Sequence, residues 1–556
     1  MHRNKKIIPT AFIVLNLFAG SFLSAQSRGL QAIRAADMKS HLEFLSAREF
    51  EGRSAPSAAL NIASRYIALQ AQRIGLKPLL PSGAYLQQIP VEVTTLSPAK
   101  SMLKVLFPGG EQSFDFPRSF GVNVRSGAEG VVSGGLVFLG TILNGPAADW
   151  AKLTLPELRG KIVMILDIPA PAPASTGASP AGSPAMNRVR FLRDKGAVGQ
   201  LTVISAEREK NLAEKGLNFD IGERLRFPDV DTSIPGVAAP APAQSAAAAP
   251  FFQADLRHEA GASILGIPWT EFEAIFAGAA QGQTVGAKDL PNRTGEISLY
   301  YETRKTMTPN VVAWIEGTDA KLKSEYVTIS SHHDHLPMRE GRIFPGADDN
   351  GSGAVAMLSL AQAMMIERPK RSVIFVWNTA EEKGLIGSYY FVQHCPVPVE
   401  KISAELNFDM ISRNDPNMIY LIGSNKLSSE LDAAIHIAND KSARMKLDYT
   451  FESTNHPDQF FFRSDQYPYI RYGIPGVWFF CGTTPDYHTD GDFFERADLA
   501  KAEKVAKLVY LTCWDIGNIP ALLKLDLNPE ITARGPANMK INWRKPPQPT
   551  AIQEKK

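Results

Sequence analysis

The chain has 556 residues, of which 44% are hydrophobic and 21% are charged. This length suffices for several domains of about 100–200 residues each, and the composition excludes a largely disordered chain, a collagen-like fibre and a coiled coil. The 59 basic and 57 acidic residues give a net charge of +2 without a long basic block, which argues against a nucleic-acid or anionic-membrane partner. The three cysteines form no C-x-x-C pair, which excludes a thiolate zinc site and a disulfide scaffold.

The first 25 residues have the pattern of a secretory signal peptide. Basic residues precede an apolar run, residues 7–23, which ends at Ser24-Ala25. This run is shorter than the stretch of about 20 apolar residues that a membrane-spanning helix needs. We therefore expect cleavage after Ala25 and an exported protein, periplasmic or secreted, without a membrane anchor.

Residues 31–125 are expected to form the N-terminal part of the main domain. The region from Ala35 to about Leu80 has a helical pattern. Its apolar residues recur at helical spacing within two segments, both of which end before Gly75. This pattern predicts an amphipathic helical hairpin that covers a hydrophobic core.

Residues 126–290 are expected to form a small inserted domain that is rich in β-structure. Strand-like runs surround one helical segment near Arg188–Lys195. The strand-like runs are Gly135–Leu139, Lys161–Asp167 and Gln200–Ile204. Two Ala/Pro-rich segments, 169–186 and 235–250, predict loops.

Residues 295–530 alternate between buried strands and helices, as in a parallel α/β domain. The strand-like runs include Tyr326–Ser330, Val373–Asn378 and Ile402–Phe408. The fold class expected for the whole chain is therefore α/β, with a mixed, mainly parallel sheet flanked by helices and an inserted small β-rich α/β domain. Residues 531–556 are expected to be a C-terminal tail.

Histidines and acids follow several of these strands. They lie in five elements: His332-His333-Asp334-His335, Asp348-Asp349, Glu381-Glu382, Asp409 and Asp486-Tyr487-His488. Each element alone could be a solvated loop or a helix cap. The carboxyl ends of strands in an α/β sheet share one edge, where ligands bind, so we expect these side chains to lie together. Imidazole and carboxylate donors without a thiolate are typical of a catalytic Zn²⁺ site.

The charge of the candidate ligands predicts two zinc ions. Asp349, Glu382 and Asp409, together with one bridging hydroxide, carry four negative charges, which balance two Zn²⁺ ions. Magnesium fits less well because it rarely binds imidazole.

The order H-x-D-H, G-A-D-D-N-x-S-G, E-E-x-G-x-x-G-S, N-x-D-M and Y-H-T-D resembles metallopeptidase family 28. This family includes secreted aminopeptidases and glutamate carboxypeptidase-type enzymes with a zinc exopeptidase fold. The resemblance is strong over residues 295–520. Within residues 126–290, Gly160–Val163 and Lys195–Gly199 resemble a protease-associated domain.

The resemblance implies a ligand set for two zinc ions. His332 and Asp409 would hold one ion. Glu382 and His488 would hold the other. Asp349 would bridge the two ions.

The resemblance also implies roles around the metals. Asp334 would orient His332, and Glu381 would be the general base. Tyr487 would hydrogen-bond the developing oxyanion. His335 is expected to be a loop residue rather than a third histidine ligand.

The function expected from the resemblance is an exported di-zinc exopeptidase that acts on peptides. We expect an aminopeptidase that removes bulky apolar N-terminal residues, with a metal-bridged hydroxide as nucleophile. The aromatic residues that could line its pocket are Phe460, Phe461, Phe462, Tyr467, Trp478 and Phe479.

Other functions remain open at this point. A carboxypeptidase or dipeptidase of the same family needs a cation for the terminal carboxylate, and Arg463 and Arg471 lie in a suitable segment. A related branch forms N-terminal pyroglutamate by acyl transfer. An inactive binding ectodomain predicts lost ligands, whereas all five are present. The sequence leaves the oligomeric state and the physiological substrate open.

Overall fold

The computed structural model describes residues 28–122, 128–144, 147–168, 184–232, 251–527, 531–532 and 538–539. The predicted signal peptide, residues 1–25, lies outside this part of the chain. So do most of the predicted tail and of the two Ala/Pro-rich segments. Among the described residues, no helix has the length and apolar character needed to cross a bilayer.

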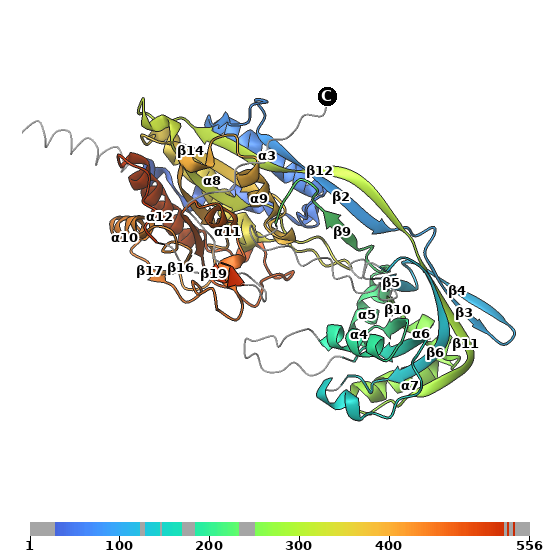
Figure 1. The fold of residues 1–556 in the computed structure, drawn as a ribbon. Coiled ribbons are helices and arrows are strands. Elements are labelled where there is room, and N and C mark those ends of the chain that lie inside the picture. Colours follow the sequence, from blue (N-terminus) through green and yellow to red (C-terminus); the bar gives the residue numbers. More distant parts are fainter. Residues whose placement is uncertain are drawn as a thin grey trace, which may run out of the picture.

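The larger part of the molecule is a mixed β-sheet with helices on both faces (Figure 1). The sheet has the strand order β17-β16-β18-β15-β13-β14-β12-β2-β9, and β1 pairs with β12. Its strands are β1 (Lys77–Pro78), β2 (Leu86–Leu96), β9 (Glu223–Arg226), β12 (Tyr301–Ile315), β13 (Tyr326–His332), β14 (Ser372–Asn378), β15 (Ile402–Phe408), β16 (Met418–Ile422), β17 (Lys446–Asp448) and β18 (Gly476–Phe480). The central strands β18, β15, β13 and β14 are parallel, and β12 and β2 are antiparallel to their neighbours. This arrangement confirms the predicted α/β fold class.

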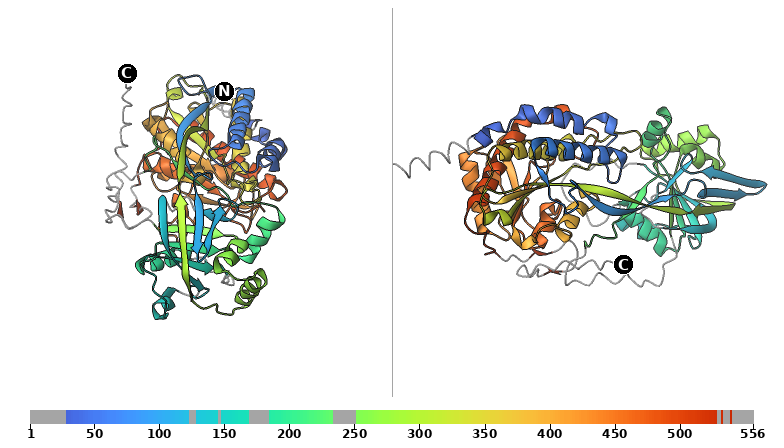
Figure 2. Two further views of the ribbon diagram at one scale, coloured as in Figure 1. Left: turned by 90° about the vertical axis from the view of Figure 1, so that its right-hand side faces the viewer. Right: turned by 90° about the horizontal axis from the view of Figure 1, so that it is seen from above.

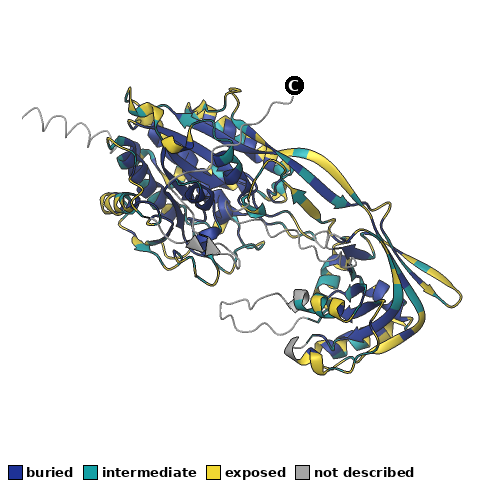
Figure 3. Cartoon of the chain, in the orientation of Figure 1, coloured by how far each residue is buried: buried dark blue, intermediate teal, exposed yellow. Residues whose placement is uncertain are grey.

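The central strands are continuous apolar runs because both of their faces are covered. Side chains of β14 alternate between two cores: Phe375 and Trp377 face one, whereas Ile374 and Val376 face the other. The first core includes α2 (Ala35–Leu45), α3 (Ala58–Ile74), α8 (Gly353–Ile366) and α12 (Leu499–Asn518). On the opposite face lie α9 (Ile386–Gln393) and α11 (Gln466–Arg471). Figure 3 shows this buried centre, and α2 and α3 correspond to the predicted hairpin.

A second sheet forms the other end of the molecule (Figure 1). Its strand order is β4-β3-β11-β6-β7-β8-β10-β5, with parallel pairing from β6 to β10. Its elements are β3 (Met102–Phe107), β4 (Gly110–Asp115), β5 (Phe120–Val122), β6 (Gly130–Gly140), β7 (Lys161–Leu166), β8 (Gly199–Val203), β10 (Phe252–Leu256) and β11 (Lys288–Leu299), with helices α4 (Pro184–Asp194), α5 (Ala206–Glu214), α6 (His258–Leu265) and α7 (Trp269–Ala280). We call residues 102–299 the inserted unit.

The inserted unit begins before residue 126, where the sequence places its boundary. Strand β3 pairs with β11, and β5 pairs with β10, so residues 102–122 complete the second sheet instead of the main one. These pairings join segments that are far apart along the chain, which is why local sequence patterns did not locate them.

A long ribbon joins the two sheets. Strand β2 pairs antiparallel with β12 from Leu86–Val311 to Leu96–Tyr301. The chain continues from β2 into β3 and enters β12 from β11, so the ribbon leads directly into the second sheet (Figure 2). Strand β9 returns from the inserted unit and pairs with β2, which adds a second connection.

The inserted unit also holds a loop of the main unit, residues 336–345. Arg208 on α5 donates to Glu340 Oε1 from Nη2 at 2.6 Å and from Nε at 2.9 Å, and to Asp255 Oδ2 at 2.7 Å. Asn211 Nδ2 donates to the Glu340 carbonyl oxygen at 3.2 Å. Because this loop follows the H-x-D-H motif directly, the inserted unit is tied to a segment that carries predicted site residues.

We expect Arg208→Ala to loosen this loop. Hydrogen bonds to charged groups contribute about 1.5–3 kcal/mol when buried. The side chain of Arg208 is 36% exposed and that of Glu340 17%, so a loss of roughly 1–2 kcal/mol is expected. Hydrogen exchange measured by mass spectrometry should become faster in residues 336–345.

The matched control is Arg226→Ala, since Arg226 is 71% exposed and pairs with Glu92 at 2.8 Å. An exposed pair of this kind contributes about 0–1 kcal/mol, so exchange in residues 336–345 should stay unchanged. Equal exchange of this loop in wild type and Arg208→Ala would contradict the anchoring role.

Candidate metal centre

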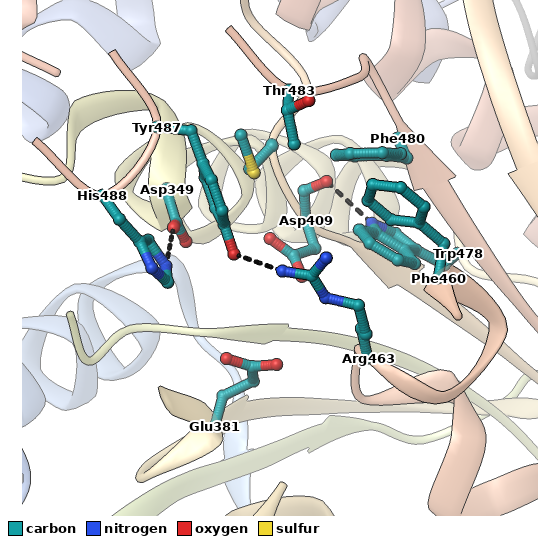
Figure 4. A pocket seen from close by; sticks show the side chains of 11 residues that line it. Asp349, Glu381, Asp409, Phe460, Arg463, Trp478, Phe480, Thr483, Tyr487 and His488 are labelled. Carbon is teal, nitrogen blue, oxygen red and sulfur yellow. Dashed lines mark hydrogen bonds and ion pairs between the residues drawn. The ribbon is translucent and has the colours of Figure 1, made fainter. Parts of the chain in front are cut away.

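The predicted site residues converge at the carboxyl ends of the central parallel strands. His332 ends β13, the Glu381-Glu382 pair follows β14, and Asp409 follows β15. Asp349 lies just before α8, and His488 lies in the loop after β18 (Figure 4). The shared edge of parallel strands explains why residues so far apart in sequence meet here.

Asp349 occupies the middle of this cluster. Its Oδ1 lies 3.4 Å from His332 Nε2, and its Oδ2 lies 3.1 Å from His488 Nε2. The backbone N–H of Asp349 donates to Asp492 Oδ2 at 3.0 Å, which fixes the main chain at this point. One carboxylate therefore faces two imidazoles with two different oxygens, as a bridging ligand would.

The first donor group consists of His332, Glu381 and Asp409, whose candidate ligand atoms all lie within 4.8 Å of one another. His332 Nε2 lies 3.3 Å from Asp409 Oδ1. His332 Nδ1 is 3.1 Å from the backbone oxygen of Asp334 and 3.7 Å from its carboxylate. The carboxylate of Asp334 instead accepts the backbone N–H of Glu381 at 3.1 Å. Asp334 thus holds both the imidazole and the glutamate loop in place.

Asp409 is oriented by two further side chains. Ser464 Oγ donates to Asp409 Oδ2 at 2.5 Å, and Trp478 Nε1 donates to its backbone oxygen at 2.8 Å. These contacts leave Oδ1 directed at His332.

The second donor group consists of His335, Asp349 and Glu382, which also lie within 4.8 Å of one another. Glu382 Oε2 is 3.2 Å from His488 Nε2, and Glu382 Oε1 is 3.0 Å from His335 Nδ1. His335 lies in a loop, as expected, but its ring is fully buried against the site. The sequence feature that indicated His335 as a site residue was its place as the last histidine of the H-x-D-H motif.

The pKa values of the two adjacent glutamates, Glu381 and Glu382, are shifted in opposite directions. Burial raises the pKa of Glu381 well above its ordinary value. Burial also disfavours the ionised form of Glu382, but the imidazoles of His335 and His488 outweigh it and hold the pKa of Glu382 well below its ordinary value. Glu382 is therefore the better anionic ligand, and Glu381 the better proton carrier.

Arg53 is a site residue that sequence reasoning missed, because no motif surrounds it. Its side chain is buried, and its guanidinium donates to four backbone oxygens from three segments. The acceptors are Leu45 at 2.5 Å, His333 at 3.1 Å, Pro345 at 2.6 Å and Gly346 at 2.9 Å. Arg53 therefore fixes the loops that carry His335 and Asp349.

Arg53 also supplies positive charge beneath the acids. Burial lowers its pKa to about 10, and nearby carboxylates, Asp492 and Asp334 first among them, oppose that decrease. The guanidinium thus stays charged at neutral pH.

A pocket opens beside the donor groups (Figure 4). Its aromatic lining includes Phe460, Trp478, Phe480 and Tyr487. Arg463 also lines the pocket and donates from Nη2 to Tyr487 Oη at 2.9 Å. Of the aromatics expected there, Phe461, Phe462, Tyr467 and Phe479 do not belong to its lining. Arg471 is buried elsewhere and donates to Tyr389 Oη at 2.6 Å.

The donors fit a metal ion. His335 Nε2 is buried and makes no hydrogen bond within the described part of the chain, while His335 Nδ1 and Glu382 Oε1 face each other at 3.0 Å. Buried polar atoms normally have a partner, so a ligand is the simplest explanation for these atoms. Imidazole and carboxylate donors without thiolate are characteristic of catalytic Zn²⁺ sites.

The comparisons with known proteins agree with this geometry. Residues 310–513 match the family model described as peptidase family M28. Leucine aminopeptidase 2 of Trichophyton equinum is 30% identical over 198 residues, which are 34% of this chain and 36% of the fungal protein. An aminopeptidase of Pseudomonas aeruginosa is 43% identical over 119 residues, 21% of each chain. The similarity to these curated relatives thus covers well under half of their length.

A solved zinc aminopeptidase from Bacillus subtilis has a similar fold. It superposes with a TM-score of 0.50 at 15% identity, covering 88% of this chain and 96% of that one. Identity this low indicates the fold alone.

We expect Arg53→Met to weaken both the fold and the metal centre. Leaving a buried acceptor without its donor costs about 1–3 kcal/mol, and Arg53→Met leaves several backbone oxygens in that state. Urea unfolding should report this loss, and equilibrium dialysis against Zn²⁺ should report weaker binding because the loops of His335 and Asp349 lose their anchor.

Arg371→Met is the matched control. Arg371 is equally buried, but it bonds Glu325 Oε2 and the backbone oxygens of Ile516 and Ile519, away from the donor groups. It should lower stability without changing zinc affinity. Unchanged zinc binding in folded Arg53→Met would refute the role of Arg53 in the site.

Proposed function

We propose that this chain is a zinc-dependent aminopeptidase, because residues 310–513 match the model of peptidase family M28. It removes bulky apolar residues from the N-terminus of peptides. The observation that carries the proposal is Asp349, whose two carboxylate oxygens face His332 and His488 separately. The aminopeptidase names of the relatives support the same activity.

In this proposal the chain holds two zinc ions. His332 and Asp409 would hold one, Glu382 and His488 would hold the other, and Asp349 would contribute to both. When bound, such ions lower the pKa of a water molecule and polarise the scissile carbonyl.

Glu381 is the proposed general base. Its raised pKa favours proton uptake, and the adjacent Asp334 holds its backbone N–H, which fixes its position. Glu381 takes the proton of the attacking water and delivers it to the leaving amine.

Tyr487 is the proposed donor to the oxyanion. Its Oη accepts a hydrogen bond from Arg463, which leaves its own O–H able to donate, and Tyr487 lines the pocket. A donor held in place before the reaction stabilises developing charge without a cost of reorganisation.

The substrate's N-terminal residue fits between acids and aromatic rings. Glu381 and Asp409 supply negative charge for an ammonium group, and Phe460, Trp478 and Phe480 supply an apolar wall. This combination supports recognition of a free, bulky, apolar N-terminus.

Arg463 supports a second candidate function. A cation in the pocket suits a terminal carboxylate, as a carboxypeptidase or dipeptidase of the same family requires. Its hydrogen bond to Tyr487 offers another role for the same side chain, so the aminopeptidase remains our first proposal.

Two further parts of the proposal concern the rest of the chain. The basic and then apolar N-terminal segment supports export to the periplasm or the medium. The inserted unit is proposed to be a protease-associated domain that contacts peptide substrates.

The end of the peptide that is recognised can be tested with three substrates. We expect cleavage of Leu-p-nitroanilide and no cleavage of N-acetyl-Leu-p-nitroanilide or of an N-blocked dipeptide. Chelation should abolish the activity, and added Zn²⁺ should restore it. Cleavage of the N-blocked dipeptide alone would favour the carboxypeptidase.

The two glutamates should respond differently to the same substitution. Glu381→Gln should keep both metals and lower kcat by roughly 10²–10⁴-fold, as expected for a lost general base. Glu382→Gln should lose metal, measured by mass spectrometry of the dialysed protein. If Glu381→Gln lost metal and Glu382→Gln kept it, Glu381 would be the metal ligand and Glu382 the general base.

A further inference from the structure

His335 has an environment unlike that of its two neighbouring histidines. His333 bonds Asn378 O through Nδ1 and Ser64 Oγ through Nε2, both at 2.7 Å. His332 Nδ1 bonds the Asp334 backbone. His335 is fully buried, its Nδ1 lies 3.0 Å from Glu382 Oε1, and its Nε2 makes no hydrogen bond to any described residue. Leaving a buried polar group unpaired is costly, so its position requires an explanation.

The ring of His335 faces the second donor group. Its Nδ1 lies 3.0 Å from Glu382 Oε1 and 3.7 Å from Asp349 Oδ2. His488 Nε2 lies 3.1 Å from the same Asp349 Oδ2 and 3.2 Å from Glu382 Oε2. Two imidazoles thus approach the same two acids.

These separations match those between ligands of one zinc ion. With bonds of about 2.0–2.2 Å and ligand–metal–ligand angles of about 90–109°, as in a five-coordinate site that keeps a position for water, two ligand atoms lie roughly 2.8–3.6 Å apart. Three of the separations above, 3.0, 3.1 and 3.2 Å, fall in this range, and the fourth, 3.7 Å, lies just beyond it.

The backbone holds His335 in this position. Its backbone N–H donates to the Arg53 carbonyl oxygen at 3.1 Å. Gly346, with φ of +60°, packs against the ring so closely that a Cβ there would lie 2.5 Å from His335 Cγ. Any other residue at position 346 would push the ring out of place.

We propose that His335 is a fourth protein ligand of the zinc ion held by Asp349, Glu382 and His488. This inference rests on the proposed function and adds a ligand outside the set that the motifs imply. The two metal positions then differ, with one imidazole at the position of His332 and two at the position of His335 and His488. The position with two imidazoles holds its ion more tightly and releases it last during chelation.

The first experiment uses the unaltered protein loaded with Co²⁺. Each coordinated imidazole gives a paramagnetically shifted, exchangeable N–H signal in the proton NMR spectrum. Three such signals support the proposal. Two signals would overturn the role of His335 and leave the proposed function intact, and failure to bind any metal would overturn the proposed function itself.

The second experiment compares variants by chelator competition. Loss of a partner that only orients a ligand weakens metal affinity by about 10–100-fold. We expect His335→Asn to weaken binding of one of the two ions by more than about 100-fold and to remove one shifted signal. A weakening within 10–100-fold with all signals kept would make His335 a positioning residue instead.

His333→Asn is the matched control, because His333 is equally buried and already hydrogen-bonded. It should leave zinc affinity and the number of shifted signals unchanged. Circular dichroism shows whether each variant is folded. If a variant does not fold, the Co²⁺ experiment on the unaltered protein still tests the proposal.

Discussion

The crowding of carboxylates at one edge of the parallel sheet is the constraint on which the rest of the structure depends. Asp334, Asp349 and Asp409 are buried there beside Glu381 and Glu382. Two like charges 4 Å apart repel by about 4 kcal/mol at an effective dielectric constant of 20. Such a cluster is stable only with compensating positive charge, whether from imidazoles, a buried cation or bound metal. The fold must therefore bring those groups to the same edge.

Arg53 meets part of this need and organises the loops at the same time. Its guanidinium donates hydrogen bonds to backbone oxygens. Among the described residues it makes no hydrogen bond to a carboxylate. The acids therefore keep their oxygens free for other partners, while the charge beneath them stays positive. A direct ion pair would have neutralised the carboxylates that the site uses. Arg53 thus positions the loops of the site without forming an ion pair with the acids.

Local sequence patterns predicted the central strands and the polar residues at their ends. The apolar run of each strand and the polar residues that follow it lie within a few positions of one another. The apolar run Tyr326–Ser330 and the following H-x-D-H motif are an example, and β13 has nearly these bounds. Arg53 could not be predicted in this way, since it acts on His333 across 280 positions of sequence. The start of the inserted unit at β3 was missed for the same reason, because its partner β11 begins at Lys288. The burial of the His335 ring likewise depends on a contact with Gly346 that no short motif records.

The inserted unit reaches the second donor group more directly than the first. Arg208 holds Glu340 in the loop between His335 and Gly346, and Arg342 of that loop pairs with Asp490, two residues beyond His488. His332 and Asp409, by contrast, sit at the ends of β13 and β15, inside the covered sheet. A shift of the inserted unit would therefore move the loop and the imidazoles beside Glu382 before it disturbed the strand ends.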